Sequence, residues 1–377
     1  MPLPQIDADY LTDQLKALLA IASPTGYTDE AVWSLCRELN ALGVDYELTR
    51  RGAIRARIKG RTQGSARALV AHVDTLGAQV KRIKETGRLE LVPIGHWSSR
   101  FAEGARVTVF GEDARVRGTI LPLKASGHTF NKEVDAQPVA WTQVELRLDA
   151  PVFSRDDVLK LGLDVGDIVA IDPQPEFLDN GFIVSRHLDD KAGVASLMAA
   201  LKALKDNEAG GPPPVDLYFL ITIAEEVGLG ASSVLVPDVA SMVTIDNGTT
   251  APGQNSSEFG VTIAMADQTG PFDWHLTHKL VRLAREHDIP FQKDVFRYYR
   301  SDSASALEAG ADIRTALITF GVDASHGYER IHLDALISVA RLAVAYALSP
   351  VEIERDRERV SGPEGFTHQP LDDSEQG

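Results

Sequence analysis

The sequence has little cysteine and a shortage of basic residues, and each shortage excludes a class of protein. Its 377 residues include one cysteine, Cys36, so no internal disulfide can form. We therefore expect a reducing compartment. Lysine and arginine total 38 against 54 aspartates and glutamates, a net charge of −16. Such a chain suits neither phosphate backbones nor anionic membrane surfaces, so we expect no nucleic-acid or membrane partner.

Long apolar runs are also missing. The run VDLYFLITIA at 215–224 has the length of a strand, whereas a membrane-spanning helix needs about 20 apolar residues. The first residues, MPLPQIDADYLTDQL, lack the basic and apolar regions of a signal peptide. Together with the cysteine content, these absences predict a cytoplasmic protein.

What is present is an alternation of apolar strands and amphipathic helices at both ends of the chain. This alternation predicts an α/β fold with a mostly parallel central sheet and helices on both faces. Strands are expected at 44–50, 53–59, 67–73, 215–224, 241–245 and 313–320. Helices are expected before residue 20 and at 28–42, 189–204, 271–287, 304–309 and 331–348.

The middle of the chain has a different character. Between residues 77 and 183, short alternating segments such as ARVTVFG and QVELRLDA are separated by glycine, proline and aspartate. This pattern predicts a small β-rich insert, either a barrel or a sandwich. The α/β domain would then consist of residues 1–76 and 184–350. The charged segment 351–377, which has no periodicity, is predicted to be a disordered tail.

Ionisable residues follow apolar segments at five places in the α/β part, at the sheet edge where ligands bind in such folds. Most of these motifs have an ordinary explanation when taken singly, such as a solvated strand end, helix-dipole compensation or a turn. The adjacent carboxylates Glu225 and Glu226 are the exception, because at the end of a buried strand they repel each other unless a cation compensates. The five motifs are AHVDTLG (71–77), SRHLDDKAG (185–193), AEEVGLG (224–230), MVTIDNG (242–248) and DASHGYER (323–330).

Taken together, the motifs supply the mixed nitrogen and oxygen ligands that two divalent ions about 3.5–4 Å apart require. Of the two histidines near the last motif we prefer His326 over His332, because His332 falls where the final helix should begin. Competing chemistries have weaker support, since the chain has no G-x-S-x-G motif, no P-loop and no dinucleotide fingerprint. Cys36 lies inside a predicted helix and fits a core position.

The order H-x-D, D-D-K-x-G, E-E-x-G, D, H resembles the co-catalytic metallo-aminopeptidases of the tetrahedral (dodecameric) aminopeptidase and glutamyl aminopeptidase group. The resemblance covers the chain to about residue 350. The stretches APGQNSSEFGVTIAM (251–265), RYYRSD (297–302) and DASHGYER are similar to the branch associated with the osmoprotectant N-acetylglutaminylglutamine amide. The resemblance implies a zinc-peptidase-like fold and hydrolysis of the N-terminal peptide bond of short peptides.

The resemblance also implies a metal site. His72 and Asp246 would hold one metal, Glu226 and His326 the other, and Asp189 would bridge them. Zinc is the first candidate for both ions, and cobalt or manganese would also accept these ligands.

Two further residues take roles by resemblance. Glu225 would be the general base that activates a metal-bridging water, and Asp74 would orient His72. The insert would partly cover the active site and assemble the chain into a homo-oligomer, for which the dodecamers of the resembling group are the example.

Departures from the family pattern concern the substrate pocket. Asp189-Asp190-Lys191 stands where D-D-R or D-N-R is usual, and Ser301-Asp302-Ser303-Ala304 replaces G-T-D-A. Asp302 is therefore only a weak candidate for substrate binding. Arg297 and Arg300 are candidates for a basic pocket.

Two alternatives stay open. The first is a di-zinc carboxypeptidase or N-acyl amino-acid or dipeptide deacylase, which would use the same ligand types. In that family the extra domain follows the fourth ligand, whereas the long gap here follows the first, and this favours the aminopeptidase. The second is a degenerate scaffold member, which would be expected to lose a ligand or the base first.

Overall fold

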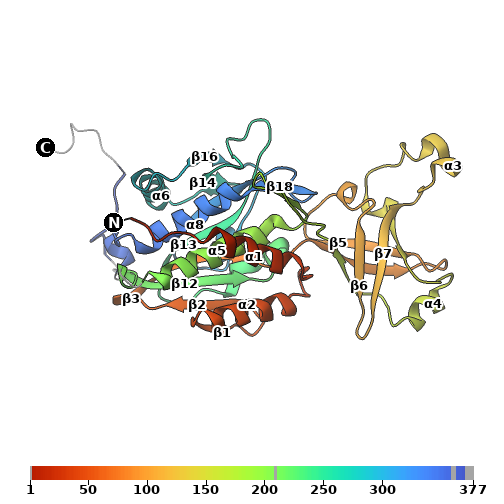
Figure 1. The fold of residues 1–377 in the computed structure, drawn as a ribbon, viewed down its shortest axis with the longest axis horizontal. Helices are drawn as coiled ribbons and strands as arrows, with labels where there is room; N and C mark the ends of the chain where they lie inside the picture. Colours follow the sequence, from red (N-terminus) through yellow and green to blue (C-terminus); the bar gives the residue numbers. More distant parts are fainter. Residues whose placement is uncertain (1, 208–209, 358–361, 370–377) are drawn as a thin grey trace.

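The computed structural model describes residues 2–207, 210–357 and 362–369, which form an α/β domain with a β-barrel inserted into it (Figure 1). A nine-stranded sheet is the centre of the α/β domain, in the order β1-β2-β12-β3-β13-β17-β14-β15, with β16 also paired to β14. Its strands are β1 Asp45–Leu48, β2 Ile54–Ile58, β3 Thr62–His72, β12 Val215–Thr222, β13 Val239–Thr249, β14 Val261–Asp267, β15 Gly270–Pro271, β16 Phe291–Val295 and β17 Arg314–Val322. The adjacent strands β12, β3, β13 and β17 are parallel, and antiparallel strands flank them on both sides.

Both faces of the sheet are buried, as the apolar strands predicted. Along β3, Leu69 and Ala71 face one hydrophobic cluster, while Ala68 and Val70 face another. The first cluster lies beneath the long helices, and the short helix α7 (Asp302–Glu308) contributes Ala306 to the second. The long helices are α1 Ala8–Leu19, α2 Asp29–Ala41, α5 Leu188–Asp206, α6 Trp274–Glu286 and α8 Leu333–Leu348.

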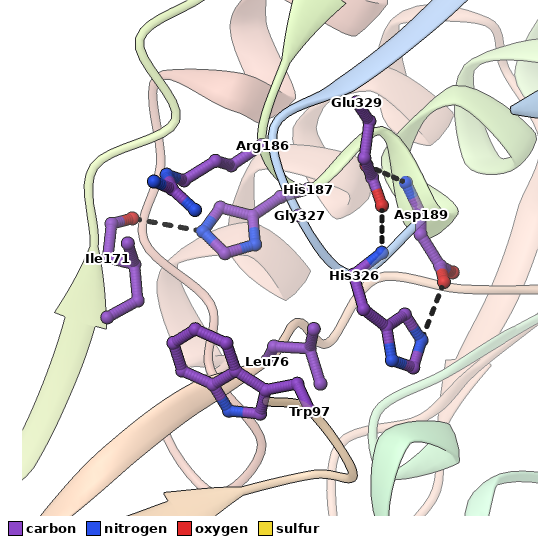
Figure 2. A pocket seen from close by; sticks show the side chains of 9 residues that line it. All are labelled: Leu76, Trp97, Ile171, Arg186, His187, Asp189, His326, Gly327 and Glu329. Carbon is purple, nitrogen blue, oxygen red and sulfur yellow. Dashed lines mark hydrogen bonds and ion pairs between the residues drawn. The ribbon is translucent and has the colours of Figure 1, made fainter. Parts of the chain in front are cut away.

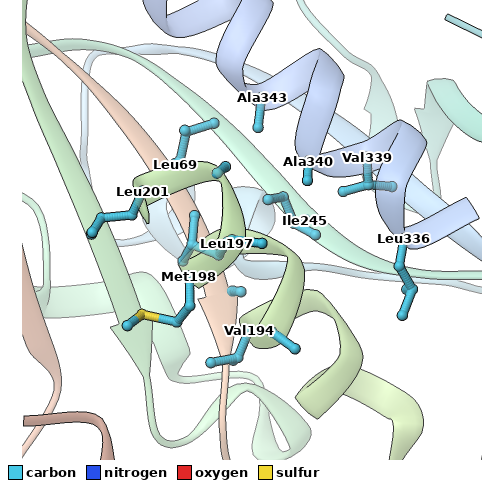
Figure 3. Close-up of a cluster of buried hydrophobic side chains, with 14 of the residues drawn as sticks. Leu69, Val194, Leu197, Met198, Leu201, Ile245, Leu336, Val339, Ala340 and Ala343 are labelled. Carbon is cyan, nitrogen blue, oxygen red and sulfur yellow. The ribbon is translucent and has the colours of Figure 1, made fainter. Parts of the chain in front are cut away.

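The helices α5 and α8 pack against each other and onto the sheet (Figure 3). Val194, Leu197 and Leu201 of α5 meet Leu69 and Ile245 of the strands, and all of these side chains are fully buried. Such burial contributes roughly 1.5–3 kcal/mol for each large apolar side chain. This packing fixes the start of α5, where Asp189 lies, against the ends of the strands.

The insert is a closed antiparallel barrel, and a sandwich is therefore excluded. The strands close in the order β4-β5-β8-β7-β6-β9 around a core that includes Val107, Ile120 and Leu146. The barrel stands at one end of the α/β domain, clear of the long helices (Figure 1). Its strands are β4 Gly77–Ile83, β5 Leu89–Ile94, β6 Arg106–Phe110, β7 Arg115–Pro122, β8 Val144–Leu148 and β9 Ile168–Ile171, and two short helices, α3 Gly127–Phe130 and α4 Arg155–Lys160, lie outside it.

A three-stranded sheet carries the chain back from the barrel. It consists of β10 (Glu176–Phe177), β11 (Phe182–Ser185) and β18 (Glu329–His332), with β11 in the middle. The chain leaves the α/β domain just after Asp74 and returns just before Asp189. Both crossings therefore lie beside residues that the sequence assigns to the site.

The prediction of a disordered tail from residue 351 is wrong for its first part. Glu354–Asp356 forms a 3-10 helix, and the Asp356 carboxylate accepts a hydrogen bond from Arg314 Nε at 2.9 Å. The ion pair holds this segment because Arg314 also pairs with Asp273 on the α/β domain. Residues 358–361 and 370–377 of the predicted tail lie outside the described residues. Across the described part of the chain, no helix is both long and apolar enough to cross a membrane.

Candidate active site

The strand order brings four of the five sequence motifs to one edge of the sheet, and the start of α5 adds Asp189 there. β12, β3, β13 and β17 are neighbours and parallel, so their carboxyl ends meet there. His72 ends β3 and pairs in register with Thr222, the last residue of β12. Asp246 lies on β13, and His326 is in the loop that follows β17.

Asp189 lies between the two histidines, where a bridging ligand is expected. Its Oδ1 is 3.1 Å from His72 Nε2, and its Oδ2 is 3.3 Å from His326 Nε2. The Asp189 carboxylate also accepts a hydrogen bond from Asn247 Nδ2 at 2.6 Å. The peptide bond between Asp189 and Asp190 is cis.

The potential ligands form two groups, and Asp189 belongs to the second of them. The first is His72, Glu225 and Asp246, and the second is Asp189, Glu226 and His326; within each group the ligand atoms lie within 4.8 Å of one another. A further group joins Asp189 and Asp246 to Asp190. The structure thus brings together all five predicted ligands, and Glu225 is itself a member of the first group.

The electrostatics of this cluster favour bound cations. Burial, reinforced by neighbouring carboxylates, raises the pKa of Glu225 and Glu226 well above the ordinary value and that of Asp246 to about 7. Burial opposes the charge of Asp189 too, but hydrogen bonds from His326 and His72 more than offset it and lower its pKa. Glu226 Oε1 is buried without a hydrogen-bond partner in the described chain. Divalent cations would supply both the missing contact and the missing charge.

Asp74 lies against His72, where an orienting residue is expected, and it also supports the turn after β12. The closer partner of His72 Nδ1 is the backbone carbonyl of Asp74 at 2.9 Å, while the Asp74 carboxylate is 3.5 Å away. That carboxylate accepts hydrogen bonds from the backbone N–H groups of Glu225 at 3.1 Å and Glu226 at 3.3 Å, and from the hydroxyl of Thr25 at 2.7 Å. Asp74 therefore fixes the turn that carries both glutamates.

Glu329 supports the other side of the site and was missed in the sequence. Its two carboxylate oxygens accept hydrogen bonds from the backbone N–H groups of His326 at 2.9 Å and Asp189 at 3.2 Å. Burial, with the charge of Asp189, raises its pKa to about 8. Its place in the SHGYER stretch was a signal, but only the fold shows that it joins two ligands far apart in the chain.

Tyr299 was also missed. Its hydroxyl is buried without a geometric hydrogen-bond partner among the described residues. Burial raises its pKa, and the carboxylates of Asp246, Asp189 and Glu225 raise it further. Tyr299 therefore faces the same cluster of ligands from the loop between β16 and α7.

The structure does not favour direct substrate contact by Asp302. Its carboxylate is buried and accepts hydrogen bonds from Thr222 Oγ1 at 2.5 Å and from Ala231 N at 2.7 Å. Both partners belong to the chain around Glu225 and Glu226. These bonds make Asp302 a support for the segment that follows β12.

The preference for His326 over His332 is supported by their surroundings. His332 caps α8, and its Nε2 lies 3.0 Å from the carbonyl of Asn180, away from the ligand cluster.

Arg300 forms an ion pair with Glu308, and Arg297 lies over the Tyr298 ring. Neither arginine lines the pocket beside the ligands.

A pocket opens beside Asp189 and His326 at the junction with the barrel (Figure 2). It is lined by Leu76, Trp97, Ile171, Arg186, His187, Asp189, His326, Gly327 and Glu329. His187 Nε2 is 3.0 Å from the carbonyl of Ile171, and burial lowers its pKa to about 3, so this imidazole is neutral. The pocket borders Asp189 and His326 of the second ligand group.

Comparison with known proteins decides the family. The family model described as M42 glutamyl aminopeptidase matches residues 52–342, which include all five predicted ligands and the whole barrel. The chain belongs to the M42 glutamyl aminopeptidase family. It is a hydrolase acting on peptide bonds, and the predicted resemblance to this group is confirmed.

Individual relatives agree with this family. A Bacillus subtilis protein named "Putative aminopeptidase YhfE" is 37% identical over 338 residues, which cover 89% of this chain and 97% of that protein. Aminopeptidase APDkam598 from Desulfurococcus kamchatkensis superimposes with a TM-score of 0.79 at 24% identity, covering 90% of this chain and 95% of that one. The TET1 peptidase of Pyrococcus horikoshii gives 0.79 at 23% identity, covering 90% and 100%. The two structural matches show that the fold is shared.

Proposed function

We propose that this M42 family member is a di-metal aminopeptidase that removes the N-terminal residue of short peptides, with Glu225 as general base. The observation that carries the proposal is the position of Asp189 between His72 and His326, flanked by the two ligand groups. The buried, mutually repelling carboxylates supply the charge and the oxygen atoms that two divalent ions take.

The ligand set fits two such ions, held by His72 and Asp246 on one side, by Glu226 and His326 on the other, and by Asp189 between them. We propose zinc first, with cobalt and manganese as alternatives. When bound, the ions supply Lewis-acid chemistry, which lowers the pKa of a water molecule and polarises the scissile carbonyl.

Glu225 is the residue that moves the proton. Its Oε2 lies 3.8 Å from His72 Nε2, so the carboxylate borders the first ligand group. In our proposal it accepts a proton from the attacking water and delivers it to the leaving amine. The Asp74 carboxylate holds the backbone of Glu225 and Glu226, which keeps the base and the neighbouring ligand in fixed relation.

Asn247 and Glu329 complete the support. Asn247 donates to Asp189 Oδ2, and Glu329 accepts from the backbone of Asp189 and His326. These bonds orient the ligands and exclude alternative side-chain positions. Such supporting partners typically affect metal affinity or activity by about 10- to 100-fold.

We further propose that the substrate needs a free α-amine, and that the chain serves the osmoprotectant-associated branch that its sequence resembles. The test compares kcat/KM for glutaminylglutamine amide and for its N-acetyl form. Acetylation removes the basic amine and adds bulk at the ligand cluster, so we expect the acetylated compound to be cleaved far more slowly. A preference for the acetylated compound would instead support the deacylase alternative.

The chain is also proposed to form a homo-oligomer, with a dodecamer as the first assembly to test. Support comes from solved neighbours, one described as a dodecamer and another as forming a tetrahedron or an octahedral shell. The barrel offers exposed apolar side chains such as Phe153, which is 80% exposed. Analytical ultracentrifugation of the full chain measures the assembly directly. A cytoplasmic location remains our expectation, based on the single buried Cys36.

A further inference from the structure

The pocket beside the second ligand group contains a cation that the proposed mechanism does not use. Arg186 lies on the segment between β11 and α5, three residues before Asp189, and lines the pocket with Trp97 and Ile171 of the insert (Figure 2). Burial lowers the pKa of this guanidinium, yet arginine stays charged in proteins. A half-buried positive charge therefore lines the pocket beside the second ligand group.

Arg186 has few protein partners. Its Nη1 donates to the carbonyl of Phe101 at 2.8 Å, and the guanidinium lies 5.8 Å from the centre of the Tyr328 ring. A guanidinium has five N–H donors, so most of them have no acceptor from the described chain. No carboxylate of the described residues forms an ion pair with it, in contrast to Arg300 with Glu308.

Glu329 is the acid whose charge acts on Arg186, but the two side chains form no ion pair within the described chain. Glu329 raises the pKa of Arg186, but both of its oxygens already accept from the backbone of His326 and Asp189. The other lining residues are apolar or neutral: Leu76, Trp97 and Ile171 form a wall, and His187 is held by a carbonyl. The pocket thus combines an apolar wall with one incompletely paired guanidinium.

We propose that Arg186 binds a carboxylate of the peptide substrate and so determines which peptides the enzyme prefers. This inference rests on the proposed aminopeptidase function. A guanidinium matches the planar geometry of a carboxylate, and the partly water-excluded wall strengthens the ion pair. The carboxylate comes either from the side chain of the N-terminal residue or from the C-terminus of a dipeptide.

The experiment uses the full-length, metal-loaded protein and two matched substrate pairs. Glutamyl and glutaminyl p-nitroanilides differ only in the side-chain charge, and leucyl-leucine and leucyl-leucinamide differ only in the terminal charge. Arg186→Gln keeps a donor for the Phe101 carbonyl but removes the positive charge. We expect kcat/KM for the carboxylate member of one pair to fall by about 10- to 100-fold relative to its neutral member.

The pair that responds identifies the source of the carboxylate. Arg186→Lys keeps the charge without the planar fork and should give an intermediate loss. Arg100→Gln is the matched control, because Arg100 is exposed in the same junction and its loss changes the net charge equally. In this control, the ratio of kcat/KM between the carboxylate and the neutral member of each substrate pair should stay within about twofold of the wild type, as expected of exposed charges.

Three results can be told apart. If Arg186→Gln leaves both ratios unchanged while leucyl p-nitroanilide is still cleaved, the role of Arg186 is refuted and the proposed function stands. If the metal-loaded wild type cleaves no substrate with a free amine, the proposed function itself fails. A uniform loss on all four substrates, with unchanged ratios, would show a purely structural tether and also refute the inference.

Discussion

The replacement Glu225→Gln separates proton transfer from metal binding at this site. Glu225 belongs to the first ligand group by distance, yet Asp246, His72 and Asp189 remain to hold an ion there without it. Glutamine has the same shape and keeps the backbone N–H that donates to Asp74 at 3.1 Å. The substitution therefore removes the proton acceptor and leaves the turn in place.

The expected loss is large and confined to turnover. Loss of a general base typically costs about 10²- to 10⁴-fold in rate, which corresponds to roughly 2.7–5.5 kcal/mol in the activation barrier. Metal content and KM should change little. In the metal-free protein, burial raises the pKa of Glu225, so its charged form is unfavourable there. Replacing it by the neutral glutamine should therefore not lower the free energy of unfolding.

The assay combines inductively coupled plasma mass spectrometry for metal content with kcat and KM for leucyl p-nitroanilide. Glu226→Gln is the matched control in the same turn, and it should lose metal because Glu226 lies 4.0 Å from His326 Nε2 in the second group. The reasoning is refuted if Glu225→Gln halves the metal content or turns over within tenfold of the wild type.

Three further predictions concern the ligand cluster and the buried Lys279 of α6. Asp189→Ala should abolish binding of both ions, since this residue lies between the two groups; calorimetry that still finds two ions at native affinity would place the bridge elsewhere, with Asp190 as the first suspect. Burial raises the pKa of Asp246 from 3.8 to about 7, so the metal-free folded state binds a proton that the unfolded chain releases, and its stability should fall as pH rises through that window. A chelated sample whose denaturation midpoint is constant there, and equal to that of Asp246→Asn, would contradict this. Burial lowers the pKa of Lys279 from 10.5 to about 8, so between these pH values the unfolded chain binds a proton that the folded protein does not. The free energy of unfolding should therefore increase with pH in this range, and the increase should be absent in Lys279→Met. Identical pH slopes of the two proteins in urea titrations would count against this.

The sequence predicted the α/β fold because its signals are local. Apolar strands and amphipathic helices are visible as periodicity, and the observed strand β12 (Val215–Thr222) and helix α6 (Trp274–Glu286) fall within the predicted ranges. The β-rich insert was likewise visible from short alternating segments. Closure into a barrel was not, because it depends on the pairing of β4 with β9, which are about 90 residues apart in the chain.

In the candidate site, too, some features could be predicted from the sequence and others could not. Ligand types at strand ends were readable because parallel strands bring those ends together by geometry. Asp74 was predicted beside His72, but its bond to the Glu225 backbone and the role of Glu329 were not readable, because both act through backbone N–H groups of residues distant in sequence. No side-chain pattern records such a contact. The order in the first part of the tail was not readable for a related reason, because the ion pair between Arg314 and Asp356 joins residues 42 positions apart in the chain.

The position of the barrel links these observations. Its first strand begins at Gly77, three residues after Asp74, and the chain returns to α5 through Arg186 and His187. His187 and Arg186 bond to carbonyls of the insert, at Ile171 and Phe101. A movement of the barrel would therefore act on both sides of Asp189: on the Asp74 carboxylate that fixes Glu225 and on the guanidinium that lines the pocket. The insert is thus tied to the chain on both sides of Asp189, although none of the predicted ligands lies in it.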